Sequence, residues 1–173
     1  DVLLHLPMEP IDYPMNDPGP LALLINNPVE QNIKRFNWML NQAEDFAGFY
    51  TSNQERFSFA MSAMEVILQR ITSNKLILLY NNNQDNIMLV EKAKSINTNL
   101  LFSDLVIDNI LSEEYIRERL EIIERIALRR GYAIIVVHPF LVKQNILPRW
   151  IENLNDKNII LTSITEMMKV SNN

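Results

Sequence analysis

The most constraining feature of the sequence is a proline-rich segment that follows a short apolar stretch around His5. Proline fixes the backbone φ angle and lacks an amide donor, so this segment is excluded from helix and from a central strand. We therefore predict a shaped surface loop directly after a first strand. Such loops carry functional residues in α/β proteins, which makes His5 a candidate site residue. By itself, His5 also fits a strand-end histidine with a local hydrogen bond. The prolines are Pro7, Pro10, Pro14, Pro18 and Pro20.

Composition narrows the class of protein. A chain of 173 residues, with 47% hydrophobic and 21% charged residues, is typical of one globular domain. The net charge of -5 argues against a nucleic-acid partner, because phosphate binding needs a basic surface. There is no cysteine, which excludes disulfides and thiolate metal ligands. No apolar run reaches about 18 residues, so we expect no membrane-spanning helix.

Short apolar stretches alternate with helical patterns along the whole chain. The stretch at 76–79 is apolar without interruption, which indicates a strand buried on both faces of a parallel sheet. Such alternation predicts an α/β fold with a mainly parallel sheet or barrel, whose site lies at the carboxyl ends of the strands. The expected strands are 3–6, 47–50, 76–79, 100–102, 105–107, 134–137 and 159–161, and the expected helices are 28–45, 61–71, 87–93, 112–130 and 147–154.

Two helices carry recognisable end signals. Ser112, followed by two glutamates, is a typical first residue of the long helix, and Gly131 fits the position just after its end. For the first helix, Asn27 is the expected N-cap, with Pro28 at the first helical position. A buried stripe is then expected at Val29, Ile33, Phe36 and Leu40.

Motifs at both ends of the chain resemble the divergent polysaccharide deacetylase family. They are the run from His5 to Pro10, Tyr13-Pro14 and Asp17-Pro18-Gly19-Pro20 near the start, and Arg130-Gly131-Tyr132-Ala133, His138-Pro139 and Ile160–Ile164 near the end. The resemblance covers essentially the whole chain. It implies a β/α barrel-like fold, a relation to metal-dependent carbohydrate deacetylases, and a periplasmic or envelope location. We expect residues 1–173 to be one such domain that lacks the family's opening strands.

The resemblance also implies a divalent metal, such as zinc, and an acetylated carbohydrate partner. His5 and His138, the only histidines, both lie where predicted strands end. Both could therefore face one pocket at the carboxyl ends of the strands and act as metal ligands. They could equally be two unrelated strand-end histidines. Zinc enzymes commonly use three protein ligands, so this pair is an incomplete set.

The sequence departs from the family at several expected site positions. The strand that bears the family's catalytic and metal-binding Asp pair would precede Asp1. The motif Asn-Asn-His-Met-Gly-Ser-Arg-Phe falls on 50–57, where Ser52 stands in place of the histidine and only Arg56 and Phe57 persist. A motif with Asp and Arg falls on 79–83 and has lost both. The catalytic residues are therefore unknown, and we expect this chain to be inactive.

Further pocket candidates have plain structural alternatives. Asp108 keeps the family's Asp-Asn pair and either caps the turn into the helix at Ser112 or contacts substrate. Glu9 could supply a carboxylate to this pocket, although a loop glutamate is usually solvated. Arg56 and Lys143 are surface candidates for binding sugar or phosphate.

Three functional hypotheses remain open. The first is a degenerate deacetylase-like domain, and the second is an active hydrolase completed by an upstream segment. The third is a carbohydrate-binding or scaffold protein without turnover. An exposed sheet edge left by missing strands would also favour self-association.

Overall fold

The computed structural model describes residues 1–52, 55–81, 86–138 and 145–171. The chain divides into two compact units, one formed by Val2–Phe102 and the other by Ser103–Asn173 together with Asp1. Each unit has its own sheet and its own buried cluster. The expectation that residues 1–173 form one domain stays a prediction.

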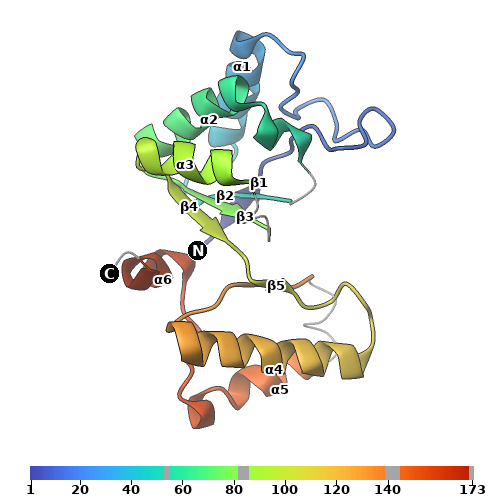
Figure 1. Ribbon diagram of the computed structural model, residues 1–173, viewed down its shortest axis with the longest axis vertical. Helices are drawn as coiled ribbons and strands as arrows, with labels where there is room; N and C mark the ends of the chain where they lie inside the picture. The colour runs from blue at the N-terminus through green and yellow to red at the C-terminus, as the bar shows by residue number, and fades with distance from the viewer. Residues whose placement is uncertain (53–54, 82–85, 139–144, 172–173) are drawn as a thin grey trace. The chain divides into compact units, whose positions relative to one another are not determined.

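The first unit is built on a four-stranded parallel sheet with strand order β1-β2-β3-β4 (Figure 1). The α/β class and the parallel pairing predicted from the alternating pattern are confirmed. Every residue of β3 is buried, as its continuous apolar sequence indicated. The strands are β1 (Leu3–His5), β2 (Gly48–Thr51), β3 (Ile77–Tyr80) and β4 (Asn99–Phe102).

Three helices lie together on one side of this sheet (Figure 1). The core between the layers includes the rings of Phe36 and Phe49, whose centroids are 5.1 Å apart. The helical segments of the unit are α1 (Val29–Leu40), the 3-10 turn η1 (Arg56–Phe59), α2 (Met61–Ser73) and α3 (Ile87–Ser95).

The start of α1 differs from the sequence prediction. Pro28 takes the N-cap position, and the Asn27 amide instead donates to Oδ1 of Asn32. The buried face of α1 contains Asn32, Phe36 and Met39, whereas Val29 is 42% exposed. The predicted cap was therefore wrong, because the side chain of Asn27 bonds to the side chain of Asn32 within α1. The first residue of the predicted stripe was also wrong, because Val29 is exposed.

Gly48 allows β2 and β3 to approach closely. A Cβ atom at this position would lie 2.0 Å from the carbonyl oxygen of Ile77. Only glycine fits such a contact with neighbouring backbone. This residue therefore sets the position of β2 and of the polar residues that follow it.

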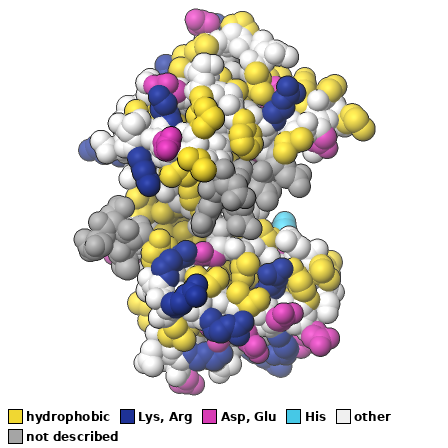
Figure 2. All heavy atoms as spheres, in the orientation of Figure 1, with side chains coloured by type: hydrophobic (Ala, Val, Ile, Leu, Met, Phe, Trp, Pro, Cys, Tyr) yellow, Lys and Arg dark blue, Asp and Glu magenta, His cyan; other side chains and the backbone are white. Residues whose placement is uncertain are grey.

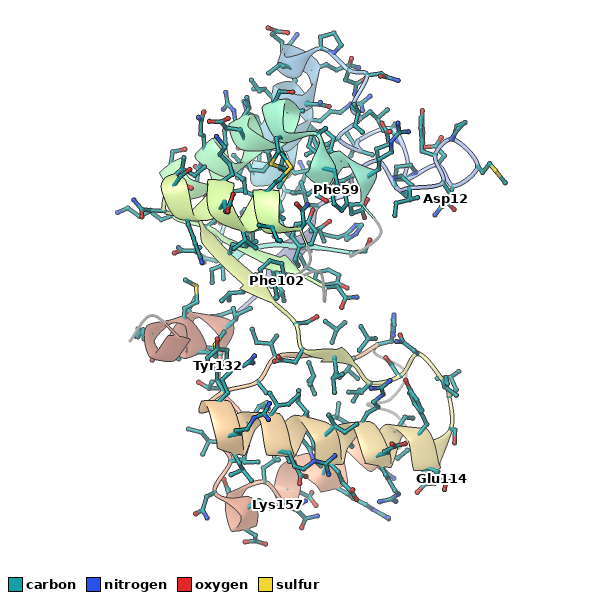
Figure 3. All side chains as sticks on the ribbon, viewed as in Figure 1. Asp12, Phe59, Phe102, Glu114, Tyr132 and Lys157 are labelled. Atoms are coloured by element: carbon teal, nitrogen blue, oxygen red, sulfur yellow. The ribbon has the colours of Figure 1, made fainter. Side chains whose placement is uncertain are left out.

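The proline-rich segment forms a loop outside the regular elements, as predicted, and its own backbone bonds order it. Glu9 N donates to the carbonyl of Leu23 over 2.8 Å, and Leu23 N donates to the carbonyl of Pro7 over 2.9 Å. Figure 3 shows Asp12 on the part of the loop that projects from the unit. Met15 on this loop is 93% exposed.

The second unit has a two-stranded parallel sheet covered by a long helix. Ser112 Oγ accepts the amide of Tyr115 at the start of α4, and Gly131 adopts a φ of 90° at its end, so both predicted end signals are confirmed. The buried cluster contains Ile107, Ile116 and Leu120. The elements are β5 (Leu105–Val106), α4 (Glu113–Arg130), β6 (Ile135–Val136), α5 (Ile146–Glu152), η3 (Asn155–Lys157) and α6 (Ile164–Ser171).

The end of the chain corrects the sequence prediction. The strand expected at 159–161 is absent, and Ile160 and Leu161 are 78% and 67% exposed. A short apolar run predicts a strand only if a partner pairs with it, and no described strand does so. Helix α6 follows instead and was not predicted. The incomplete, barrel-like form of the sheet and association through a sheet edge stay predictions.

Among the described residues, no helix has both the length and the apolar character needed to cross a membrane.

Candidate functional site

Polar side chains gather where the first strands of the four-stranded sheet end. His5 is the last residue of β1 and pairs in register with Tyr50 of β2. The two rings are 6.2 Å apart between centroids and tilted by 45°. Partial burial lowers the pKa of His5 from its usual 6.5, because the protein around the ring disfavours the charged form. His5 is therefore a partly exposed imidazole that favours the neutral form.

Ser52, directly after β2, is bonded to a carboxylate. Its Oγ donates to Oε1 of Glu55 over 2.6 Å. Glu55 is only 6% exposed, and its Oε2 has no hydrogen-bond partner among the described residues. Burial raises the pKa of Glu55 above its usual 4.5, and the bond from Ser52 partly opposes this shift. Glu55 was not among the residues expected in the site, because nothing in the sequence around an isolated loop glutamate signals burial.

Glu9 is a structural residue of the proline-rich loop. It is 2% exposed, and its Oε2 accepts the backbone amide of Ile25 over 2.9 Å. Its Oε1 lies 3.6 Å from Nη1 of Arg56, whose own side chain is 59% exposed. The alternative of a solvated loop glutamate does not hold for Glu9, because the loop folds back and encloses the carboxylate. Arg56 keeps the exposed guanidinium expected from the sequence.

A carboxylate–imidazole pair joins the ends of β5 and β6. Oδ2 of Asp108 accepts the backbone amide of His138 over 2.7 Å, and its Oδ1 lies 2.9 Å from Nδ1 of the same residue. The Asp108 side chain is 1% exposed and that of His138 is 66% exposed. A carboxylate that accepts from Nδ1 fixes the imidazole and leaves Nε2 for proton transfer. Asp108 thus positions a histidine rather than capping the turn before Ser112.

A second carboxylate holds the opposite end of the same two-stranded sheet. Oδ2 of Asp104 accepts the backbone amide of Ile134 over 2.8 Å and a hydrogen bond from Nη2 of Arg130 over 2.6 Å. The Arg130 guanidinium also lies 4.1 Å from the centre of the Tyr132 ring. Asp104 and Asp108 therefore play matching roles toward the backbone of the β6 strand. Only Asp108 contacts an imidazole, which makes Asp104 a natural control.

The described residues do not form a complete metal site. Within 1–52, 55–81, 86–138 and 145–171, no three His, Asp or Glu side chains are grouped so that they could hold a metal ion. His5 and His138 belong to different units, so the pocket that they were expected to share stays a prediction. The Ser52 hydroxyl proton is already directed at Glu55. Pro139 and Lys143 lie outside the described residues.

The fold and the paired polar residues fit one family of α/β proteins. The sequence profile of the divergent polysaccharide deacetylases matches residues 1–168, so the chain belongs to that family. A crystal structure of an uncharacterized protein from Agrobacterium tumefaciens C58 is similar, with a TM-score of 0.89 and 28% identity. The similarity covers 96% of this chain and 68% of that one. No curated protein matches the sequence.

Proposed function

We propose that this member of the divergent polysaccharide deacetylases binds an acetylated envelope carbohydrate without turning it over. The observation that carries this proposal is the Ser52–Glu55 hydrogen bond of 2.6 Å. Ser52 stands where the family motif has a ligand histidine, and a neutral hydroxyl is a much weaker zinc ligand than imidazole. Because the hydroxyl proton of Ser52 is also directed at the buried carboxylate of Glu55, the side chain at position 52 suits a hydrogen bond better than metal coordination.

Several exposed polar groups support carbohydrate binding. His5, Arg56 and His138 all expose polar side chains at or near strand ends. Planar polar groups of this kind bond well to sugar hydroxyls, which both donate and accept. The family resemblance adds an envelope location to the proposal.

A second candidate function, hydrolysis of the acetyl group, is favoured by the Asp108–His138 pair. In deacetylation, the oxygen of water forms a new bond to the acetyl carbon, and the carbon–nitrogen bond breaks. The leaving amine must gain a proton. Nε2 of His138 could supply it, because Asp108 accepts from Nδ1 and holds the ring in a fixed orientation. The proton that Nε2 gives to the amine is the one that the attacking water first gives up to the neutral ring.

Acetate release separates these two functions. The assay mixes the protein with an N-acetylated oligosaccharide, with and without added zinc, and compares the native chain with His138→Ala and Asp108→Asn. Asp104→Asn is the matched control, since this variant alters the carboxylate that does not contact a histidine. Amide chemical shifts of the ¹⁵N-labelled protein report sugar binding and confirm that each variant is folded.

The proposal predicts no acetate release by any of these proteins, together with shift changes in the native chain when sugar is added. Turnover by the native chain and by Asp104→Asn, but not by His138→Ala, would establish the hydrolase instead. Absence of both turnover and shift changes would reject both functions. Losing a positioned acid typically costs about 10² to 10⁴ in rate, so the difference between variants is measurable.

A further inference from the structure

A polar groove in the second unit lies between α4 and the segment that contains α5 and η3. Its volume is about 390 Å³. The buried side chain of Leu120 and the partly buried side chains of Ile146 and Trp150 provide an apolar lining. Acidic and basic side chains also line the groove, and Figure 2 shows both kinds interspersed over the part of the surface that contains α4.

Most charged groups of this groove are already paired. Oε1 of Glu124 accepts from Nε1 of Trp150 and from Nζ of Lys157, each over 2.7 Å. Glu113 and Arg117 form an ion pair one turn apart on α4, with a bond of 3.0 Å from Nε of the arginine. Figure 3 shows Lys157 on the segment below α4. The hydrogen bond from its indole nitrogen therefore fixes the ring of Trp150. The two bonds that Glu124 accepts connect α4 to the segment that contains α5 and η3.

Two charged side chains of the groove remain free within the described part of the chain. Glu121 on α4 and Arg149 on α5 both line the groove and are exposed. Neither side chain makes a hydrogen bond or an ion pair with a described residue. The groove thus has one free carboxylate on α4 and one free guanidinium on α5, next to the ring of Trp150.

We propose that this groove is a binding site for an uncharged saccharide. Its lining contains three carboxylates and three basic side chains, namely Glu113, Glu121, Glu124, Arg117, Arg149 and Lys157. This balance favours neither an anionic nor a cationic ligand. A neutral sugar offers hydroxyls to the free carboxylate and guanidinium, and its apolar face suits an aromatic side chain. The choice of ligand class rests on the proposed function, but the groove itself does not involve His138 or Asp108.

The test uses the full chain with tryptophan fluorescence. The sequence has two tryptophans, so Trp38→Phe leaves Trp150 as the reporter inside the groove. The probes are a chitin-derived trisaccharide, a glucose trisaccharide, inorganic phosphate and spermidine. Glu121→Gln and Arg149→Ala remove the free groups. Glu118→Gln and Arg125→Ala, which are exposed on α4 outside the groove, are the matched controls.

Saturable changes in Trp150 fluorescence are expected with at least one trisaccharide below about 10 mM, and with neither charged probe. Arg149→Ala should raise the dissociation constant about tenfold, since a bond to a charged group is lost, and Glu121→Gln should raise it by a smaller factor. Both controls should stay within about twofold of the parent.

Two results would overturn the inference: no saturable change with either trisaccharide, or tighter binding of phosphate or spermidine. His138→Ala in the same background separates this inference from the proposed function. If His138→Ala abolishes all sugar binding while Arg149→Ala does not affect it, the groove site is rejected and sugar binding near His138 stands. If His138→Ala leaves the Trp150 response intact, the groove binds independently.

Discussion

Ser52–Glu55 and Asp108–His138 are two carboxylate pairs with opposite consequences for their partners. Both partner contacts are short, at 2.6 Å from Ser52 Oγ and 2.9 Å from His138 Nδ1. Glu55 receives the only proton of a hydroxyl and leaves its second oxygen buried without a partner among the described residues. Asp108 uses both oxygens and leaves the outer imidazole nitrogen of an exposed ring available. The first pair therefore commits the hydroxyl proton of Ser52 to a carboxylate, whereas the second leaves one ring nitrogen of His138 exposed.

The largest expected effect is on stability, from Asp108→Ala. This change removes two bonds that a buried carboxylate accepts from His138, and it leaves the backbone amide without its partner. We expect the free energy of unfolding to fall by about 3 kcal/mol, measured by urea denaturation. Asp104→Ala should cost a similar amount, because it loses the corresponding bonds. A loss no greater than that of Ser52→Ala would contradict the contrast between the two pairs.

Glu55→Gln should change stability in the opposite direction. Burial raises the pKa of Glu55 in the folded state, so its contribution is full below the usual value of 4.5. That contribution is lost as the pH rises through the raised pKa. We therefore expect Glu55→Gln to be more stable than the parent by about 1 kcal/mol near neutral pH, with the difference shrinking in acid. Urea denaturation across the acidic range measures this, and an unchanged or larger advantage in acid would refute it.

Ser52→Ala should have a moderate effect. It removes a hydrogen bond to Glu55, which is worth about 1 kcal/mol for a partly buried pair. Since this bond lowers the pKa of Glu55 against the effect of burial, the pKa should rise further in the variant. Carboxyl ¹³C chemical shifts followed against pH report the change. A fall in the pKa would show that Ser52 is not the donor.

The smallest effect concerns His5, the imidazole at the end of β1. Because partial burial lowers its pKa, its ring resonances should titrate below 6.5. Proton NMR can follow the only two histidines separately, with His138→Ala to assign them. A titration above 6.5 would indicate an acidic partner that the described residues do not supply.

The helices and the parallel sheet were largely predictable, because their signals are local. The hydroxyl of Ser112 and the positive φ of Gly131 mark the ends of α4, and the apolar run of β3 indicates burial on both faces. The segment at 159–161 was mistaken for a strand, since sequence alone does not show whether a partner strand pairs with it.

The site was less predictable than the fold. His138 and Asp108 were both candidates, but their pairing depends on two strands lying side by side across 30 residues. The burial of Glu9 was not predicted, and Glu55 was not a candidate, for a related reason. A loop carboxylate becomes buried only when distant backbone folds over it, and no local pattern reports this.

We infer that the hydroxyl of Ser52 serves as a hydrogen-bond donor to Glu55 and not as a metal ligand. Zinc retention through dialysis, quantified per protein chain, tests it directly for the native chain, Ser52→His and Ser52→Ala. We expect negligible zinc on the native chain and on Ser52→Ala, and measurable zinc on Ser52→His, since imidazole is the stronger ligand. Stoichiometric zinc on the native chain would contradict the account.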